Sequence, residues 1–437
     1  MSIKHRKSFL VLTIVLVHLF FIYLGGYFLS PEFTLYPYLT SLGLKPYLDL
    51  IDQHLPVVLF GPLSLPSFLT RNPQPLLGVF LSMVAITDIL FFKLLEKRKV
   101  KKPIFWTALF AVSLFVFSGN TLWLETFVAP VLLILLLLKD KPLDQLFIGI
   151  LSTTAVLIRP TLAPVILLLL VFKKIKFSRF LLAGLLIPFL ATLTYLVYHQ
   201  VLPSFFNIFL GFNTTYYPSL AGKLPSLRDL FLVGLITLPT LVALLTKKKY
   251  LPIFIILLSL LPAWPRFELT HLIPTVILSI FFWATHISSN RSNRSIVSKA
   301  LLLFLVLLSI KKISTVNYGN FYLTNEVKEV SSYLKKQDQN QVFVLGGSDL
   351  IYSLSRKNPA GDYYLPSLPW YYQNQDFVTR QLQALRLNSD SLVVINHTSS
   401  INNVPVSTFA KPVFGYILEN YSIIHTVGQY QIYKIKQ

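Results

Sequence analysis

The chain has 437 residues, of which 54% are hydrophobic and only 13% are charged. This balance is too apolar for an ordinary soluble domain of that length. The sequence contains no cysteine, which excludes disulfides, thiolate catalysis and cysteine metal sites. The formal net charge of +21 would suggest nucleic acid as a partner in a soluble protein. Here the distribution of the basic residues gives another explanation, and we expect no nucleic acid.

Long apolar runs recur over the first three quarters of the chain. Several approach the roughly 20 residues that cross a hydrocarbon core as a helix. The first run is too long for a signal-peptide core and lacks a small-residue cleavage site, so we interpret it as a retained anchor. Hydropathy predicts about eleven spans. They are residues 9–29, 75–95, 103–118, 122–138, 144–158, 161–172, 180–199, 229–246, 250–264, 271–286 and 296–313. The short segments 144–158 and 161–172 are either full crossings or re-entrant pieces.

Basic residues gather in alternate loops between these spans. The loops are Lys4–Lys7, Lys97–Lys102, Lys139–Lys141, Lys173–Arg179, Lys247–Lys249 and Arg291–Lys299. Such a bias predicts that they are cytoplasmic. Lys311 and Lys312 go against the rule, because they fall at the outer end of the last span. We therefore expect a multi-pass protein of the plasma membrane with a cytoplasmic N-terminus.

Carboxylates gather on the opposite side. The first outer segment, Ser30–Pro75, is far longer than a connection between two spans requires. It carries a group of polar residues close to the membrane surface: Glu32, Asp49, Asp52 and His54. The apolar, proline-divided stretch 55–69 is typical of a segment lying in the interface. A surface loop with solvated acids would explain any one of these residues, but the cluster favours a site. We interpret Asp88, within the second span, as a helix-packing hydrogen bond rather than a functional group.

Three further outer motifs place charged groups at span ends. Glu125 begins a span with apolar residues on either side, where an unpaired acid is costly. Arg159 lies between two apolar runs, where it either binds phosphate or snorkels to the interface. A tight turn holds a third group, which forms either a local ion pair or part of a site: Arg266, Glu268 and His271. The outer loop 201–229 is aromatic, and we favour an interfacial belt over sugar stacking.

The composition changes beyond residue 313. The pattern predicts helices at Asn325–Lys336 and Asp376–Leu387 and strands at Gln341–Leu345, Ser391–Asn396 and Gln429–Ile435. The fold class is therefore an α-helical polytopic membrane protein with a small extracytoplasmic α/β domain at the C-terminus. We divide the chain into a transmembrane domain, residues 1–313, and this α/β domain, residues 314–437. Gly346-Gly347 lacks the rest of a dinucleotide fingerprint.

The outer motifs together resemble a family. In the first outer segment they are Glu32, Tyr36, Gly43, Pro46-Tyr47, Asp49, Asp52, His54 and Pro56. Later they are Trp123-Leu124-Glu125, Ile158-Arg159-Pro160-Thr161 and Pro265–His271, and in the tail Asp349–Tyr352 and Pro359-Ala360-Gly361. This set resembles the multi-spanning, lipid-phosphosugar-dependent glycosyltransferases of the C class, such as protein mannosyltransferases and the aminoarabinose transferases of lipid A. Many members carry an Asp-Glu pair after the first span, where this chain has Pro31-Glu32.

The resemblance implies transfer of a hexose or pentose from a polyprenyl phosphate or diphosphate to a glycan, lipid or protein acceptor at the outer face, usually with inversion. One carboxylate would act as general base, and positive charge would stabilise the leaving phosphate. The candidates for the base are Glu32, Asp49 and Asp52. The candidates for substrate or phosphate binding are His54, Glu125, Arg159, Arg266, Glu268 and His271. No cofactor is certain, and a divalent metal stays open.

Two other classes of protein stay open. A transporter would place its polar residues near the bilayer midplane, often in an internal repeat. A lipid-linked glycan ligase or flippase accessory shares the lipid-linked substrate and is harder to separate. We expect the carboxylates and histidines of three separate outer segments to converge on one cavity at the outer membrane surface, as acid–base chemistry requires.

Overall fold

The computed structural model describes residues 3–65, 73–220, 222–287, 292–315 and 319–436. The chain forms two compact units whose segments alternate along the sequence. The helical unit comprises Met1–Phe28, Leu77–Leu190 and Leu224–Asn320. The mixed unit comprises Leu29–Leu76, Ala191–Lys223 and Phe321–Gln437. The first outer segment and part of the aromatic loop thus belong to the same compact unit as the tail.

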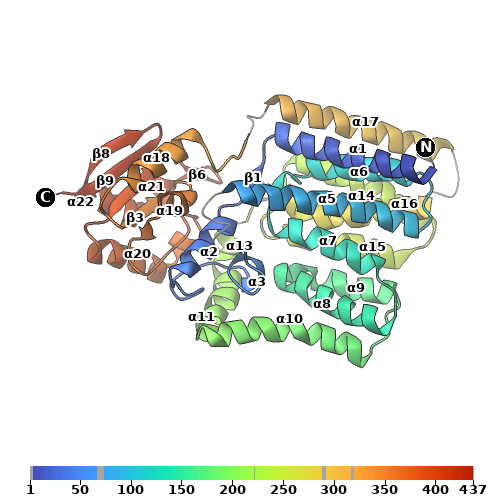
Figure 1. The fold of residues 1–437 in the computed structure, drawn as a ribbon, viewed down its shortest axis with the longest axis horizontal. Helices are drawn as coiled ribbons and strands as arrows, with labels where there is room; N and C mark the ends of the chain where they lie inside the picture. The colour runs from blue at the N-terminus through green and yellow to red at the C-terminus, as the bar shows by residue number, and fades with distance from the viewer. Residues whose placement is uncertain (1–2, 66–72, 221, 288–291, 316–318, 437) are drawn as a thin grey trace. The chain divides into compact units, whose positions relative to one another are not determined.

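Each span expected from hydropathy lies on a helix (Figure 1). These are α1 (Ile3–Leu24), α5 (Pro73–Lys97), α6 (Pro103–Val116), α7 (Leu124–Leu137), α8 (Pro142–Ile158), α9 (Ala163–Phe172), α10 (Arg179–Tyr198), α14 (Leu227–Thr246), α15 (Tyr250–Leu258), α16 (Ile273–Ile287) and α17 (Ser292–Thr315). α10 begins in the helical unit and ends in the mixed unit. Proline occupies the first position of α6 and α8, where its missing N–H costs no hydrogen bond.

Length and composition support a multi-pass membrane protein. Among the described residues, 5 helices are long and apolar enough to cross a bilayer: His5–Leu24, Pro75–Lys97, Arg179–Tyr198, Leu227–Thr246 and Leu269–His286. Five more of the expected spans lie on apolar helices of 10–17 residues in the described part of the chain. The helix α17, at 24 residues, belongs to neither group. Of the residues in Leu269–His286, 83% are buried. This segment overlaps α16, which contacts α6, α7, α14 and α15 and is therefore the central helix of the unit. The count of eleven crossings and the orientation stay predictions.

Helix contacts in the helical unit depend on close approach. Figure 1 shows α1, α6 and α17 side by side, and α6 contacts both of the others. At the crossing of α8 and α10, Gly149 lies so close to its neighbour that an added Cβ would be 2.5 Å from the Leu181 carbonyl oxygen. A Cβ added at Gly184 would likewise clash with the Leu146 carbonyl oxygen. Small residues at both positions therefore allow the two backbones to touch.

Polar contacts link helices of this unit. His18 Nδ1 of α1 lies 2.8 Å from Asp88 Oδ2 of α5, and both side chains are buried. This contact confirms the interpretation of Asp88 as a helix-packing hydrogen bond. Lys312 of α17, an exception to the charge bias, donates to the Phe115 carbonyl (3.0 Å) and to Asn120 Oδ1 (2.9 Å). Its ammonium also lies 4.6 Å from the centre of the Phe115 ring. Lys312 is thus held by the end of α6 and needs no contact with cytoplasm.

The mixed unit is built on a five-stranded sheet of order β4-β3-β5-β9-β8. The strands are β3 (Gln341–Leu345), β4 (Asn358–Pro359), β5 (Leu392–Asn396), β8 (Tyr421–Val427) and β9 (Tyr430–Ile435). β3 runs parallel to β4 and β5, whereas β9 runs antiparallel to β5 and β8. The helices of the tail are α18 (Asn325–Lys335), α19 (Leu350–Ser355), α20 (Gln375–Leu387), α21 (Val406–Phe409) and α22 (Lys411–Asn420). The α/β character of the tail is therefore confirmed.

The remaining segments of the mixed unit come from two of the loops that we expect on the outer side. The first outer segment contains α2 (Glu32–Ser41) and α3 (Pro56–Leu59), while residues 66–69 of its expected interfacial stretch lie outside the described residues. The aromatic loop forms α11 (Leu202–Phe206), η2 (Asn207–Phe212), α12 (Asn213–Thr215) and α13 (Tyr217–Leu220). Phe212 is buried and stacks on Tyr371 at 5.1 Å, and Phe205 meets Tyr47 at 5.1 Å. These two rings pack inside the unit instead of forming an interfacial belt.

We predict that Gly149→Ala destabilises the protein by about 1–3 kcal/mol, because the added methyl group forces α8 and α10 apart. Gly78→Ala in α5 is the matched control, since nothing lies within 4 Å of its added Cβ. It should leave stability unchanged or raise it by up to about 1 kcal/mol through helix propensity. Thermal unfolding of the purified protein in detergent measures both. Equal midpoints for the two variants would contradict the close approach.

Candidate functional site

The residues singled out from the sequence divide into two clusters. The mixed unit holds the carboxylate cluster: Glu32, Asp49, Asp52 and His54. The helical unit holds the ion-pair cluster: Glu125, Arg159, Arg266, Glu268 and His271. Each cluster brings together residues that we expected to meet. Convergence of the two clusters on one cavity stays a prediction.

Asp52 is the centre of the carboxylate cluster. The Tyr36 hydroxyl donates to Asp52 Oδ2 at 2.5 Å. Asp52 Oδ1 accepts the backbone N–H of His54 and faces His54 Nδ1, both at 2.7 Å. Burial alone would raise the pKa of Asp52, but the charge and hydrogen bonds of His54, together with Tyr36, hold that pKa below its usual value. Since an ionised carboxylate only accepts hydrogen bonds, His54 Nδ1 carries the proton that it donates.

Aromatic and amide groups hold the Asp52–His54 segment in place. The Tyr47 hydroxyl donates to the His54 carbonyl at 2.7 Å. Asn213 Nδ2 donates to the Gln53 carbonyl at 3.0 Å, and the Tyr371 hydroxyl accepts the Gln53 N–H at 3.2 Å. The sequence does not indicate a positioning role for these three side chains, because they lie in three different parts of the chain. Together they restrict the positions available to the His54 ring.

Glu32 occupies the first turn of α2, where the positive end of the helix dipole favours a carboxylate. The Ser30 hydroxyl donates to Glu32 Oε2 at 2.5 Å. Burial raises the pKa of Glu32 and outweighs the lowering by the Ser30 bond, while the nearby Asp52 charge raises it further and His54 lowers it. Glu32 is therefore a stronger base than an ordinary glutamate, as proton abstraction near neutral pH requires.

Asp349 is a further carboxyl group of this cluster. It is the fourth residue after β3, at the start of α19, and it interacts with Glu32 and with Tyr364. Burial first, and then the Glu32 charge, raise the pKa of Asp349 to about 7. In the sequence, Asp349 stands out only as part of the motif Asp349–Tyr352. Its position after a strand with parallel neighbours was the available signal, because polar groups at the carboxyl ends of parallel strands commonly bind ligands.

Asp49 has a local role in the structure. Its Oδ2 accepts the backbone N–H of Lys45 at 2.9 Å, which closes the turn before it. Its carbonyl accepts the N–H of Tyr364 at 2.6 Å. These contacts explain Asp49 as a turn residue and favour Glu32 over it as the base.

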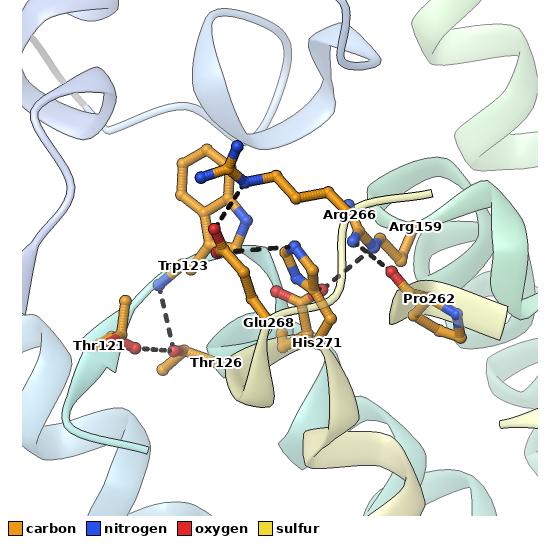
Figure 2. A network of polar contacts seen from close by, with 9 residues as sticks. Thr121, Trp123, Thr126, Arg159, Pro262, Arg266, Glu268 and His271 are labelled. Atoms are coloured by element: carbon orange, nitrogen blue, oxygen red, sulfur yellow. Dashed lines mark hydrogen bonds and ion pairs between the residues drawn. The ribbon is translucent and has the colours of Figure 1, made fainter. Parts of the chain in front are cut away.

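The ion-pair cluster is built around Glu125, which lies in the first turn of α7 and is fully buried. Its Oε1 lies 3.0 Å from Arg159 Nε and 2.9 Å from His271 Nδ1. Arg159 Nη2 also donates to the Pro262 carbonyl at 2.7 Å, a contact visible in Figure 2. Pro160 ends α8 at Arg159, because the residue before proline avoids the helical conformation. The break directs Arg159 toward Glu125, so the arginine is paired within the protein and does not need to snorkel.

The turn after α15 completes the ion-pair cluster. Two short 3₁₀ helices form it, η3 (Leu261–Ala263) and η4 (Leu269–Leu272). Arg266 Nε donates to Glu268 Oε1 at 2.6 Å, and Glu268 Oε2 lies 3.9 Å from His271 Nε2. Figure 2 shows the three side chains pointing toward one another. The local ion pair that we considered for this turn is confirmed, and His271 links it to Glu125.

The two clusters differ in what they are able to do chemically. The carboxylate cluster offers acid–base groups with shifted pKa values and an oriented imidazole. The ion-pair cluster offers two guanidinium groups, of which Arg266 has the more accessible carboxylate partner: the Glu268 side chain is 33% exposed and that of Glu125 is 0% exposed. Among the described residues, no group of three or more His, Asp or Glu side chains is arranged to hold a metal ion.

No family model matches the sequence, and no curated protein matches it.

We predict that Arg159→Met strongly destabilises the protein, by about 3–5 kcal/mol, because it leaves Glu125 buried without its guanidinium partner. Arg159→Met combined with Glu125→Gln should recover much of the loss. Arg266→Met is the matched control and should cost about 1 kcal/mol or less, since its partner Glu268 is partly exposed. Thermal unfolding in detergent ranks the three variants. Equal losses for Arg159→Met and Arg266→Met would contradict the buried pair.

Asp349 predicts a pH dependence of stability. Its pKa is raised from 3.8 to about 7 by folding, so the folded protein binds this proton more tightly than the unfolded chain. The resulting stabilisation is fully present below about pH 4 and is lost as pH rises through about 7. Asp349→Asn removes this titration. Its unfolding midpoint should therefore rise relative to wild type between about pH 5 and pH 8. Asp338→Asn, at an exposed site of the same unit, is the control and should follow wild type.

Proposed function

We propose that the chain is a membrane glycosyltransferase that moves a sugar from a polyprenyl phosphate or diphosphate to a glycan, lipid or protein hydroxyl at the outer face of the membrane. The observation that carries this proposal is the carboxylate cluster. It combines a carboxyl group of raised pKa, Glu32, with the ordered Asp52–His54 pair. Support also comes from its place in the chain, directly after the first long apolar helix.

Glu32 acts as the general base in this proposal. The acceptor oxygen attacks the anomeric carbon, its proton passes to the Glu32 carboxylate, and the bond from the anomeric carbon to the phosphate oxygen breaks. The phosphate carrier leaves as an anion and takes the bonding electrons. Because phosphate is a good leaving group, no second acid has to protonate it, in contrast to glycoside hydrolysis. Asp52 orients the imidazole of His54 for contact with the acceptor hydroxyl or the donor phosphate.

Arg266 is the better of the two candidates for the leaving phosphate. A phosphate that reaches this turn competes with Glu268, a partly exposed carboxylate, for a planar guanidinium. Arg159 would have to leave the fully buried Glu125, which costs far more. Arg159 then serves to hold Glu125 and His271 in position. This assignment requires both clusters to face the same donor, as we expected from the sequence.

The test uses the purified full-length protein reconstituted in vesicles and supplied with a panel of polyprenyl-linked sugars. Release of the carrier phosphate and transfer of the sugar are followed together. Glu32→Gln should lower transfer by about 100-fold or more, because it removes the base. Asp49→Asn is the matched control in the same segment and should retain most of the activity.

Both variants must also unfold at the same midpoint as wild type, so that a loss of transfer does not reflect a loss of folding. If wild type releases no carrier phosphate from any donor in the panel, or if Glu32→Gln transfers sugar at the wild-type rate, the proposed function or its base is wrong. If Asp49→Asn loses sugar transfer and Glu32→Gln keeps it, Asp49 is the base and Glu32 is not.

A further inference from the structure

Three cations from two separate loops meet at the last turn of α7. Lys97 ends α5 and donates to the Leu137 carbonyl, and Arg98 Nη2 donates to the carbonyl of residue 136 at 3.4 Å. Lys173 follows α9 and donates to the carbonyls of residues 135 and 138, the latter at 2.8 Å. We call these three residues the α7 cation cluster. Carbonyls at a helix C-terminus lack partners within the helix, so each of these contacts is favourable.

The positive charge of the α7 cation cluster is larger than the negative partial charge at the C-terminus of α7. A helix C-terminus carries about half a negative charge, against three cations here. Among the described residues, no carboxylate lies within 4.0 Å of the cluster. The two nearby acids are engaged by other groups: Asp140 Oδ1 accepts from Gln145 Nε2 (2.5 Å), and Asp144 Oδ2 accepts from the Lys139 N–H (2.9 Å).

The cations also disfavour one another. Burial first, and then the neighbouring charges of Arg98 and Lys97, lower the pKa of Lys173 to about 8. An anion placed among the three would remove this repulsion. Donors remain for it, since a guanidinium has five N–H groups and an ammonium has three.

Exposed apolar side chains adjoin the cluster. The loop before α10 lies against the loop before α8, because the Lys176 N–H reaches Asp140 Oδ1 at 3.4 Å and Ser178 bonds Gln145. Phe177 lies in the loop before α10 and Leu143 in the first turn of α8, and their exposed fractions are 77% and 64%. A soluble anion or a nucleic acid would leave both in water. An amphipathic ligand would cover them.

We propose that the α7 cation cluster binds the phosphate headgroup of an anionic phospholipid, whose acyl chains lie against Leu143 and Phe177. Arg98 supplies the planar fork that matches phosphate oxygens, and the two lysines supply point charges. The cluster lies at the ends of apolar helices within basic loops, where headgroups are at hand and anionic lipids are attracted. This inference is independent of the proposed transferase activity.

The test compares phospholipid retention by native mass spectrometry. Full-length protein is purified from detergent that contains equal amounts of phosphatidylglycerol and phosphatidylcholine. Wild type should retain phosphatidylglycerol in preference to phosphatidylcholine. Arg98→Gln combined with Lys173→Gln should lower the retained phosphatidylglycerol roughly tenfold. Lys99→Gln combined with Lys174→Gln removes the same charge from the adjacent exposed positions and should behave as wild type.

Thermal unfolding of the wild type provides a second measurement that does not depend on the folding of a variant. Added phosphatidylglycerol should raise the unfolding midpoint, whereas phosphatidylcholine and inorganic phosphate should not. Equal stabilisation by inorganic phosphate would assign the cluster to a soluble anion instead. Equal retention of the two lipids by wild type, or equal losses in the two double variants, would overturn the site.

Discussion

A charged group inside an apolar helix bundle must have its partner within the protein, because hydrocarbon offers no hydrogen bonds. The helical unit meets this constraint with contacts between different helices. Glu125 of α7 pairs with Arg159 at the end of α8, and Asp88 of α5 bonds His18 of α1. Lys312 of α17 bonds the end of α6. Each of these charges therefore fixes the position of one helix against another, in addition to any chemical role.

Short helices make this constraint more severe. α8 ends at Arg159 because Pro160 follows, and the chain then turns through η1 (Pro160–Leu162) into α9. Such a break exposes backbone groups, and the arginine must also be satisfied there. The arginine at the break has its partners within the protein, since it ion-pairs with Glu125 and donates to the Pro262 carbonyl of another turn. A break that would be costly in lipid thus becomes the point at which three segments are joined.

Hydropathy and turn chemistry predict the positions of the helices, and local patterns predict three of the five strands of the larger sheet. β8 was missed because Tyr421–Val427 is an edge strand whose central residues are largely exposed, so its sequence carries little burial pattern. For the candidate site, the density of polar groups indicated Glu32, Asp52 and His54. The partners of Glu125 could not be predicted, since hydropathy gives depth in the membrane and not which helices touch. Asp349 could not be predicted as a site residue either, because it is far from Glu32 in the sequence and only the folding of the tail brings the two together.

Two carboxylates of one outer segment acquire opposite properties from their surroundings. Asp52 has both oxygens engaged, by Tyr36 and by His54, and its pKa falls. Burial raises the pKa of Glu32, and the neighbouring Asp52 charge raises it further. Environments that separate the pKa values of neighbouring acids also separate their possible roles. A carboxylate that already accepts several hydrogen bonds is suited to orienting an imidazole, whereas one whose charge is disfavoured gains most from accepting a proton.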